Sequence, residues 1–495
     1  MRTFVLLALG VFFYWALNMV FFSNRPNTVT EYISSEFRRP NPYALLYVAE
    51  YRFVDQVGEF LVRKDNNQHT VPGLAAEWIV NSENGTIQFK LRERAAYSAE
   101  EAAQSLRRIV RFGQTSHSYF ASQVLAIDVQ GDDTLTIKTK GDPAAILDPL
   151  CMADAVILPN DHWVQQDEEE VVDWSKSRGP YKIVSGTFPL KSGDRLELSP
   201  NKNHYLYKSG QLNWRIVPLD MHKVHSHSDL ESIFSSEPAF MTVRHWPFTK
   251  LFHSPVGGQL EFYETRTNGI GFVALNQNSP IFNTLEMRRT VFWNHLNSNF
   301  NTGGALRAFQ IPQPGMIGYA DEKSLPFHSF SQSLTPQQKE GFRIRFAIPN
   351  GDYVASAWLK ALGNTLFPGY VDFVDGPTIA AGEKWDTGEI DAVFCGVGMS
   401  DTDPISGASF LFSKHGANLD LPSGDVLSIL NSGKALVDPE AVRSTVAHAF
   451  RTAESQALLI PVLYLKNRHY HSQGVQLNIS DPFAESVQIW NVRLD

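Results

Sequence analysis

The first half of the chain carries two pairs of short segments in which apolar and polar residues alternate. In the first pair, residues 75–81 and 86–91 flank Asn84-Gly85, and an Asn-Gly dipeptide between alternating segments is a strong signal for a β-hairpin. In the second pair, residues 125–129 and 134–139 flank a glycine in the same way. Alternation with a period of two is typical of strands with one buried face. We therefore expect antiparallel hairpins here.

Helical signals lie between and after these strands. Ser98 and Glu101 form a capping box, which predicts a helix that begins at Ser98 and ends near Arg111. Asp142-Pro143 predicts the start of another helix near Ala144. Strand-like and helix-like segments then alternate over 214–219, 228–235, 271–275, 285–295, 342–348, 353–364 and 392–396. This alternation predicts an α/β architecture with mixed sheets.

Residues 4–22 form an uninterrupted apolar segment without a charged side chain. A helix needs about 20 such residues to span a bilayer. The small-residue pattern that ends most cleavable signal peptides is poor here, because the segment runs into Phe21, Phe22 and Ser23. We expect residues 1–23 to be either a cleaved signal peptide or a retained membrane anchor. Both alternatives place residues 28–495 outside the cytoplasm. A third, less favoured interpretation is that residues 4–22 form a buried core helix, which would not imply export.

Length and composition exclude several classes of protein. The 495 residues suggest two to four domains at roughly 100–200 residues each, or a large two-lobed protein. The formal net charge is −9 and there is no long basic run, so we expect no binding to nucleic acid. The two cysteines, Cys151 and Cys395, exclude a disulfide scaffold and a four-cysteine zinc site. Both lie in apolar segments and are predicted to be buried free thiols, although a pair remains an alternative.

The motifs of common catalytic and cofactor sites are missing. There is no G-x-S-x-G elbow, no G-x-G-x-x-G or phosphate-binding loop, and no H-E-x-x-H. We therefore predict neither an enzyme nor a cofactor. His222, His225 and His227 form the cluster most similar to a metal site, and a polar surface loop is the alternative interpretation. A metal-binding protein or a hydrolase that uses these histidines is the least favoured function.

A series of short blocks resembles, in the same order, a known family. The blocks are 40–42 (Pro-Asn-Pro), 71–78 (Val-Pro-Gly-Leu-Ala-Ala-Glu-Trp), 86–92, 102–106, 178–181 (Arg-Gly-Pro-Tyr), 193–198, 203–205, 275–288, 388–404 and 460–462. Together they make the chain similar to the bacterial extracytoplasmic solute-binding proteins of family 5, the dipeptide- and oligopeptide-binding components of ABC importers. The resemblance extends over essentially the whole exported part.

The resemblance implies an α/β, two-lobed fold like that of the periplasmic binding proteins, of the large class with an extra subdomain on lobe one. Lobe one would comprise residues 28–270, with the extra subdomain at about 45–165. Lobe two would comprise residues 271–465, and residues 466–495 would return to lobe one. The sheets would be mixed, and the two crossovers would form a hinge whose closure buries the ligand.

The implied function is capture of a peptide or another small polar solute for the permease of an ABC importer, without catalysis. A monomer would work in the periplasm or at the outer face of the cytoplasmic membrane. The alternative with the same fold is a membrane-tethered ligand sensor or chaperone that serves no transporter.

Relatives that bind peptides hold the ligand's α-ammonium with an aspartate just before an Asp-Pro step, which points here to Asp401. The spacing differs by one residue, so that Ser400 takes the matching position, and a turn aspartate is an equal alternative for Asp401. The loop at residues 348–353 lacks the arginine that dipeptide binders offer to the ligand carboxylate. The candidate ligand-binding residues are Asp401, Ser400, Met399, Trp385 and Tyr353.

Overall fold

The fold is described from a computed structural model of the chain. The structure describes residues 28–494 except for segments 34–36, 46–47, 66–68, 113–117, 167–168, 208–211, 221–223, 225–226, 246–259, 298–305, 309, 313–342, 350–352, 377–382, 399–403, 413–423, 434–435, 437 and 480–488. The expected signal peptide or anchor at residues 1–23 lies outside the described residues. Within the described part, no helix is long and apolar enough to cross a membrane.

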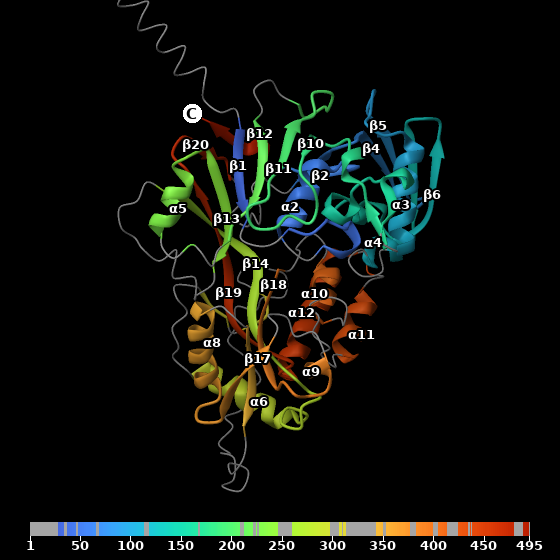
Figure 1. The fold of residues 1–495 in the computed structure, drawn as a ribbon. Coiled ribbons are helices and arrows are strands. Elements are labelled where there is room, and N and C mark those ends of the chain that lie inside the picture. Colours follow the sequence, from blue (N-terminus) through green and yellow to red (C-terminus); the bar gives the residue numbers. More distant parts are fainter. Residues whose placement is uncertain are drawn as a thin grey trace, which may run out of the picture.

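One eleven-stranded mixed sheet extends through the whole molecule (Figure 1). Its strands, in sheet order, are β10 (Tyr181–Ser185), β11 (Leu196–Pro200), β12 (Asn213–Pro218), β1 (Thr28–Ile33), β13 (Ala239–His245), β19 (Leu459–His471), β14 (Glu261–Leu275), β18 (Ala392–Gly398), β16 (Ile344–Pro349) and β17 (Val371–Gly376), and β15 (Leu306–Arg307) pairs with β19. The two longest strands, β14 and β19, pair with each other and connect an upper lobe to a lower lobe. We call these lobe one and lobe two.

Lobe one is built on β10 to β13 and the adjoining halves of β14 and β19. Helix α2 (Val48–Val57) covers one face of this sheet, where Phe53 and Trp214 belong to one buried apolar cluster. Helix α5 (His227–Phe234) covers the other face, with Phe234 and Met241 in a second cluster. Lobe one therefore has a sheet with a helix on each side.

A subdomain lies beside this sheet (Figure 1). It consists of a four-stranded antiparallel sheet, ordered β4 (Ala75–Asn81), β5 (Thr86–Leu91), β7 (Thr134–Thr139), β6 (Val124–Gln130), with helices α3 (Ala99–Phe112) and α4 (Ser118–Gln123). Both predicted hairpins are confirmed. The capping box is also confirmed: the Glu101 backbone N–H donates to Ser98 Oγ (3.2 Å), and the Ser98 N–H donates to Glu101 Oε2 (2.7 Å). The helix expected near Ala144 is a single 3-10 turn, Pro143–Ile146.

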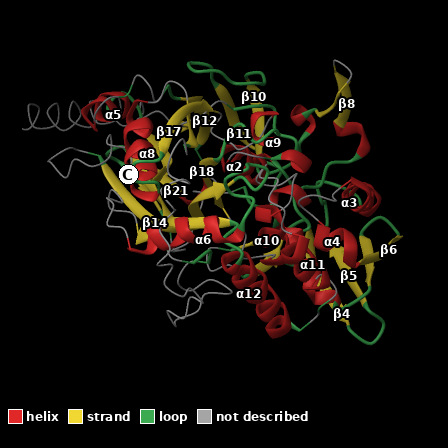
Figure 2. Ribbon diagram, turned by 90° about the horizontal axis from the view of Figure 1, so that it is seen from below, coloured by secondary structure: helices red, strands yellow, loops and turns green. Residues whose placement is uncertain are grey.

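Lobe two places helices on both faces of β14, β18, β16 and β17 (Figure 2). Helices α6 (Leu285–Asn297) and α8 (Tyr353–Leu366) pack on one face, in a cluster that includes Phe292 and Leu362. Helices α10 (Pro404–Phe412), α11 (Gly424–Gly433) and α12 (Pro439–Ser455) pack on the other. Strand β18 is buried as expected, and its Cys395 is buried and forms no disulfide. Cys151 forms no disulfide either, so the two cysteines are not paired, and it is only partly buried, where full burial was expected.

The strands that connect the lobes are irregular where they pass from one to the other. Arg266 of β14 pairs with Lys466 of β19, and the next pair is Ile270 with Tyr464. Strand β14 therefore has more residues than β19 between these two pairs, which is a β-bulge. Such a bulge interrupts the regular ladder of hydrogen bonds and bends a sheet. On the lobe-one side of the bulge, His469 bridges Thr242 and Thr265 on the two neighbouring strands (2.9 and 2.8 Å). The regular pairing of β14 with β19 is therefore interrupted between the two lobes.

Candidate functional site

The carboxyl ends of the parallel strands of lobe one lie at one edge of its sheet. Strands β12 and β13 both run parallel to β1, so Ile33 lies beside Pro218 at this edge. Strand β13 ends at His245, which pairs with Lys466 in the part of β19 next to the bulge. The carboxyl edge of lobe one therefore faces lobe two.

Lobe two has the same arrangement, but its parallel strands run in the opposite direction, so that their carboxyl ends point toward lobe one. Strands β17 and β18 both run parallel to β16, and β18 ends at Gly398, which pairs with Gly269 inside the bulge of β14. Helices α8 and α10 begin shortly after the ends of β16 and β18. In open α/β sheets, ligands bind outside the carboxyl ends of the strands. Because two such edges face each other here, the candidate site lies between the lobes.

Four of the five sequence-predicted site residues follow the ends of β16 and β18 in the chain. Met399, Ser400 and Asp401 directly follow β18, and their placement lies outside the described residues. Tyr353 is the first residue of α8, after the end of β16, and its side chain also lies outside the described part. The two strands that these residues follow, β16 and β18, are parallel neighbours.

The structure does not bring Trp385 to this edge. Trp385 lies in α9 (Glu383–Asp386), where Asn276 Nδ2 donates to the carbonyls of Trp385 and Ile390 (both 2.7 Å). Asn276 follows the end of β14 and Ile390 precedes β18, so this is the end of β18 remote from Gly398. The indole is only 2% exposed and packs in the lobe-two core, and its Nε1 has no hydrogen-bond partner among the described residues.

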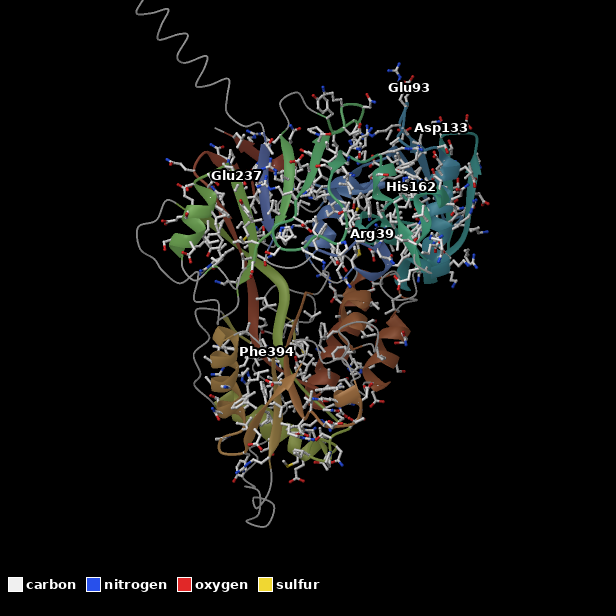
Figure 3. The ribbon with its side chains drawn as sticks, viewed as in Figure 1. Arg39, Glu93, Asp133, His162, Glu237 and Phe394 are labelled. Carbon is white, nitrogen blue, oxygen red and sulfur yellow. The ribbon has the colours of Figure 1, made fainter. Side chains whose placement is uncertain are left out.

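Two arginines at the carboxyl edge of lobe one were missed by the sequence analysis. Arg38 and Arg39 follow β1 after a short gap, and Figure 3 shows Arg39 at the side of lobe one nearest lobe two. Arg38 makes a bidentate ion pair with the buried carboxylate of Glu50 (2.9 and 3.1 Å). Arg39 donates to the side-chain oxygen of Gln166. The signal that could have found them is a basic pair a few residues after the first strand of the sheet.

The candidate metal cluster falls mostly on residues that are not described. His222 and His225 lie outside the described residues, and His227 begins α5 with its side chain outside them. Among the residues that are described, no group of three or more His, Cys, Asp or Glu side chains could hold a metal ion. The metal site at these histidines stays a prediction.

Comparison with known protein families identifies the class of this chain. The model of the family "Bacterial extracellular solute-binding proteins, family 5 Middle" matches residues 69–324, which is more than half of the 495 residues. The chain belongs to the family 5 solute-binding proteins. The family resemblance and the expected solute-binding function are thereby confirmed. No curated protein matches the chain by sequence.

Solved structures share the fold of this family 5 protein at low sequence identity. The Escherichia coli murein tripeptide binding protein MppA has a TM-score of 0.71 at 13% identity, over 94% of this chain and 98% of its own. The Haemophilus influenzae OppA complex with the peptide RPPGFSPFR has a TM-score of 0.70 at 15% identity (95% and 99%). AgaA of A. tumefaciens R10 with agropinic acid has a TM-score of 0.69 at 16% identity (94% and 99%). The two-lobed α/β fold is confirmed.

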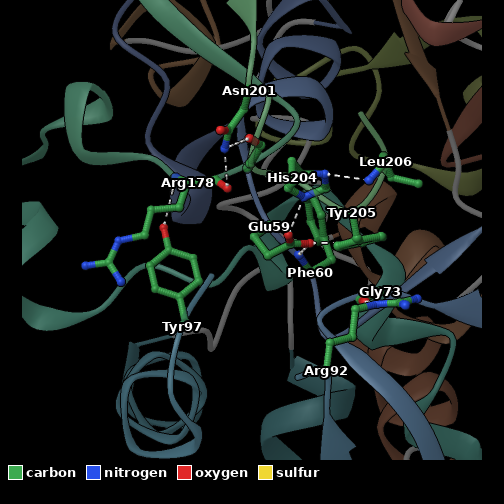
Figure 4. Close-up of polar contacts among 12 residues, drawn as sticks. Glu59, Phe60, Gly73, Arg92, Tyr97, Arg178, Asn201, His204, Tyr205 and Leu206 are labelled. Carbon is green, nitrogen blue, oxygen red and sulfur yellow. Dashed lines mark hydrogen bonds and ion pairs between the residues drawn. The ribbon is translucent and has the colours of Figure 1, made fainter. Parts of the chain in front are cut away.

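A buried polar network lies at the other edge of lobe one in this family 5 protein (Figure 4). Asn201 follows β11, which runs antiparallel to β12, so it lies at the edge opposite the carboxyl ends. Its Nδ2 donates to the carbonyls of Arg178 and Gly179 (3.2 and 2.9 Å). Nearby, the carboxylate of Glu59 accepts from His204 Nε2 (2.5 Å). The family blocks around 178–181 and 203–205 therefore stabilise lobe one away from the candidate site.

The charge of Glu59 depends on this network. Burial by itself raises the pKa of Glu59, but the hydrogen bond with His204 and the charge of Arg63 outweigh burial and hold the pKa below its usual value. Tyr205 Oη and Arg63 Nη2 both lie 3.3 Å from Glu59 Oε1. The carboxylate of Glu59 is therefore ionised, and both of its oxygens already accept hydrogen bonds. We interpret Glu59 as a structural group rather than as a general acid or base.

Proposed function

We propose that this protein captures a peptide or another small polar solute between its two lobes and delivers it to the permease of an ABC importer. The observation that carries this proposal is the pair of carboxyl edges that face each other across the two-stranded connection. Closing the lobes would exclude water from the solute and strengthen each hydrogen bond to it. The structural neighbours support a broad class of solutes, since they were solved with a nonapeptide and with agropinic acid.

The proposed action is binding alone, without chemical conversion of the solute. The family consists of extracellular solute-binding proteins, which supports an action outside the cytoplasm, and we propose that the protein acts there as a monomer. Residues 1–23 would be its signal peptide or its membrane anchor. The division into lobe one at 28–270, with its subdomain at about 45–165, lobe two at 271–465 and a return at 466–495 is part of the same proposal.

Within this site, Asp401 would hold the ammonium group of the solute, and Ser400, Met399 and Tyr353 would line the same edge. The support is their place in the chain: they follow the carboxyl ends of β16 and β18, which point toward lobe one. A carboxylate removed from water stabilises an ammonium ion strongly. Trp385 would then support β18 from the core, because it packs at the far end of that strand.

Native mass spectrometry of the protein purified from its host tests the proposal. We expect the wild-type chain to carry a small solute that is released on unfolding. The Asp401→Ala variant should retain much less of it, since a lost charge-assisted contact costs about 1.5–3 kcal/mol. Asp386→Ala, an exposed substitution in α9, should retain the solute fully. A bare wild-type chain that no peptide or amino-acid mixture stabilises against heat would contradict the function, and equal retention by Asp401→Ala would contradict only the role of Asp401.

A further inference from the structure

We propose that Arg39 binds a carboxylate of the solute, so that lobe one supplies the anionic anchor of the site. This inference rests on the proposed function and narrows the solute to a peptide-like molecule with a carboxylate. It assigns the two ends of such a molecule to different lobes, with the carboxylate on lobe one.

The backbone next to Arg39 is fixed at the edge that faces lobe two. Phe37 is fully buried and forms two backbone hydrogen bonds with Leu190, one in each direction (3.2 and 2.6 Å). Leu190 lies in the loop after β10, and β10 ends at Ser185 on the same edge as Ile33. Arg39 lies two residues after Phe37, so these hydrogen bonds hold the backbone close to Arg39 in place. Figure 3 shows Arg39 at the lower margin of lobe one.

The two neighbouring arginines differ in how their charges are compensated. The guanidinium of Arg38 is neutralised by Glu50, whose side chain is only 1% exposed. Arg39 is partly exposed, and its partner Gln166 is a neutral amide. Within the described part of the chain, no carboxylate forms an ion pair with Arg39. Its positive charge and most of its N–H donors are therefore open to a ligand.

The chemistry of a closing site favours an anion at this position. A guanidinium presents its donors in a planar fork that matches a carboxylate in a bidentate geometry. Lobe two offers no arginine for this purpose in residues 348–353, which follow β16 into α8. When the lobes close, water is removed from Arg39, and a desolvated cation without a partner is costly. A carboxylate of the solute removes that cost and links closure to the presence of the solute.

The test uses a casein hydrolysate and the same hydrolysate with its carboxyl groups amidated. We expect the untreated hydrolysate to raise the Tm of the wild-type protein and the amidated one to have little effect. Arg39→Gln should weaken the response to the untreated hydrolysate about 10- to 100-fold in the concentration required. Arg39→Lys, which keeps the charge but not the planar fork, should recover part of it. Arg343→Gln, at the amino end of β16, is the matched control and should respond like the wild type.

Three results would overturn the inference: equal responses of Arg39→Gln and the wild type, equal effects of the two hydrolysates, or no response of the wild type to either. The comparison of hydrolysates uses the wild-type chain, so it holds even where a variant folds poorly. A failure here also differs from a failure of the proposed function, because a chain that carries a solute in native mass spectrometry but ignores both hydrolysates is a solute-binding protein without this anchor.

Discussion

Replacing Asp391 by alanine is expected to lower the free energy of unfolding by about 3–5 kcal/mol. Asp391 is fully buried before β18 and accepts hydrogen bonds from Arg345 Nε and Nη2 (both 2.8 Å) and from the Arg345 backbone N–H (2.7 Å). Ser279 Oγ donates to the same carboxylate. The substitution would remove the acceptor that ties β16 and the segment after β14 to the start of β18, and it would leave several donors without a partner.

Urea unfolding of the purified variant measures this loss. Asp386→Ala removes an exposed carboxylate a few residues away and should stay within about 0.5 kcal/mol of the wild type. Asp391→Asn, which keeps the shape and one acceptor, should fall between the two. A loss below about 1 kcal/mol in Asp391→Ala would show that this carboxylate does not organise lobe two.

Replacing His204 by alanine should cost about 3 kcal/mol at neutral pH, because it leaves the ionised Glu59 buried with one donor fewer. The pKa of Glu59 lies below its usual 4.5 in the folded chain, so its contribution to stability is present above about pH 4.5 and is lost as the pH falls through the folded pKa. Without His204 that contribution is already reduced. The difference between variant and wild type should therefore shrink as the solution is acidified.

The measurement is urea unfolding of both proteins between about pH 7 and pH 3, a range that extends below the usual pKa of Glu59. His69→Ala provides a matched control, since the His69 side chain is 76% exposed and its ion pair with Asp65 lies on the surface (3.5 Å). It should cost about 0.5 kcal/mol or less at every pH. A His204→Ala difference that is small at neutral pH, or constant over the whole range, would contradict the role assigned to the network.

Local signals in the sequence predicted local structure well. The turn at Asn84-Gly85 works because Gly85 has a φ of +61°, which glycine adopts without strain, and the Ser98–Glu101 box needs only residues within one turn of helix. The Glu59–His204 contact joins residues 145 positions apart, and no pattern in the chain announces it. Long-range pairs of this kind depend on the order of strands in the sheet, which hydrophobic periods do not encode.

The candidate site could be predicted only as far as chain order determines it. Residues 399–401 and Tyr353 follow the ends of two parallel strands, and their meeting at one edge stays a prediction, because residues 399–401 lie outside the described part. Trp385 also lies between two strands in the sequence, but its segment packs at the opposite end of β18. The spacing of residues in the sequence does not show which end of a strand a neighbouring segment contacts. Arg39 was missed because a basic pair a few residues after a strand matches no binding motif, and its importance depends on which edge faces lobe two.

Hydrogen–deuterium exchange with and without the solute recovered from the purified protein tests the central claim most directly, because it reports where the solute binds. We expect slower exchange at two places far apart in the chain, residues 33–39 after β1 and residues 398–404 after β18, and little change at residues 201–205 on the opposite edge of lobe one. Protection confined to a single lobe, or centred on residues 201–205, would contradict a site between the two carboxyl edges.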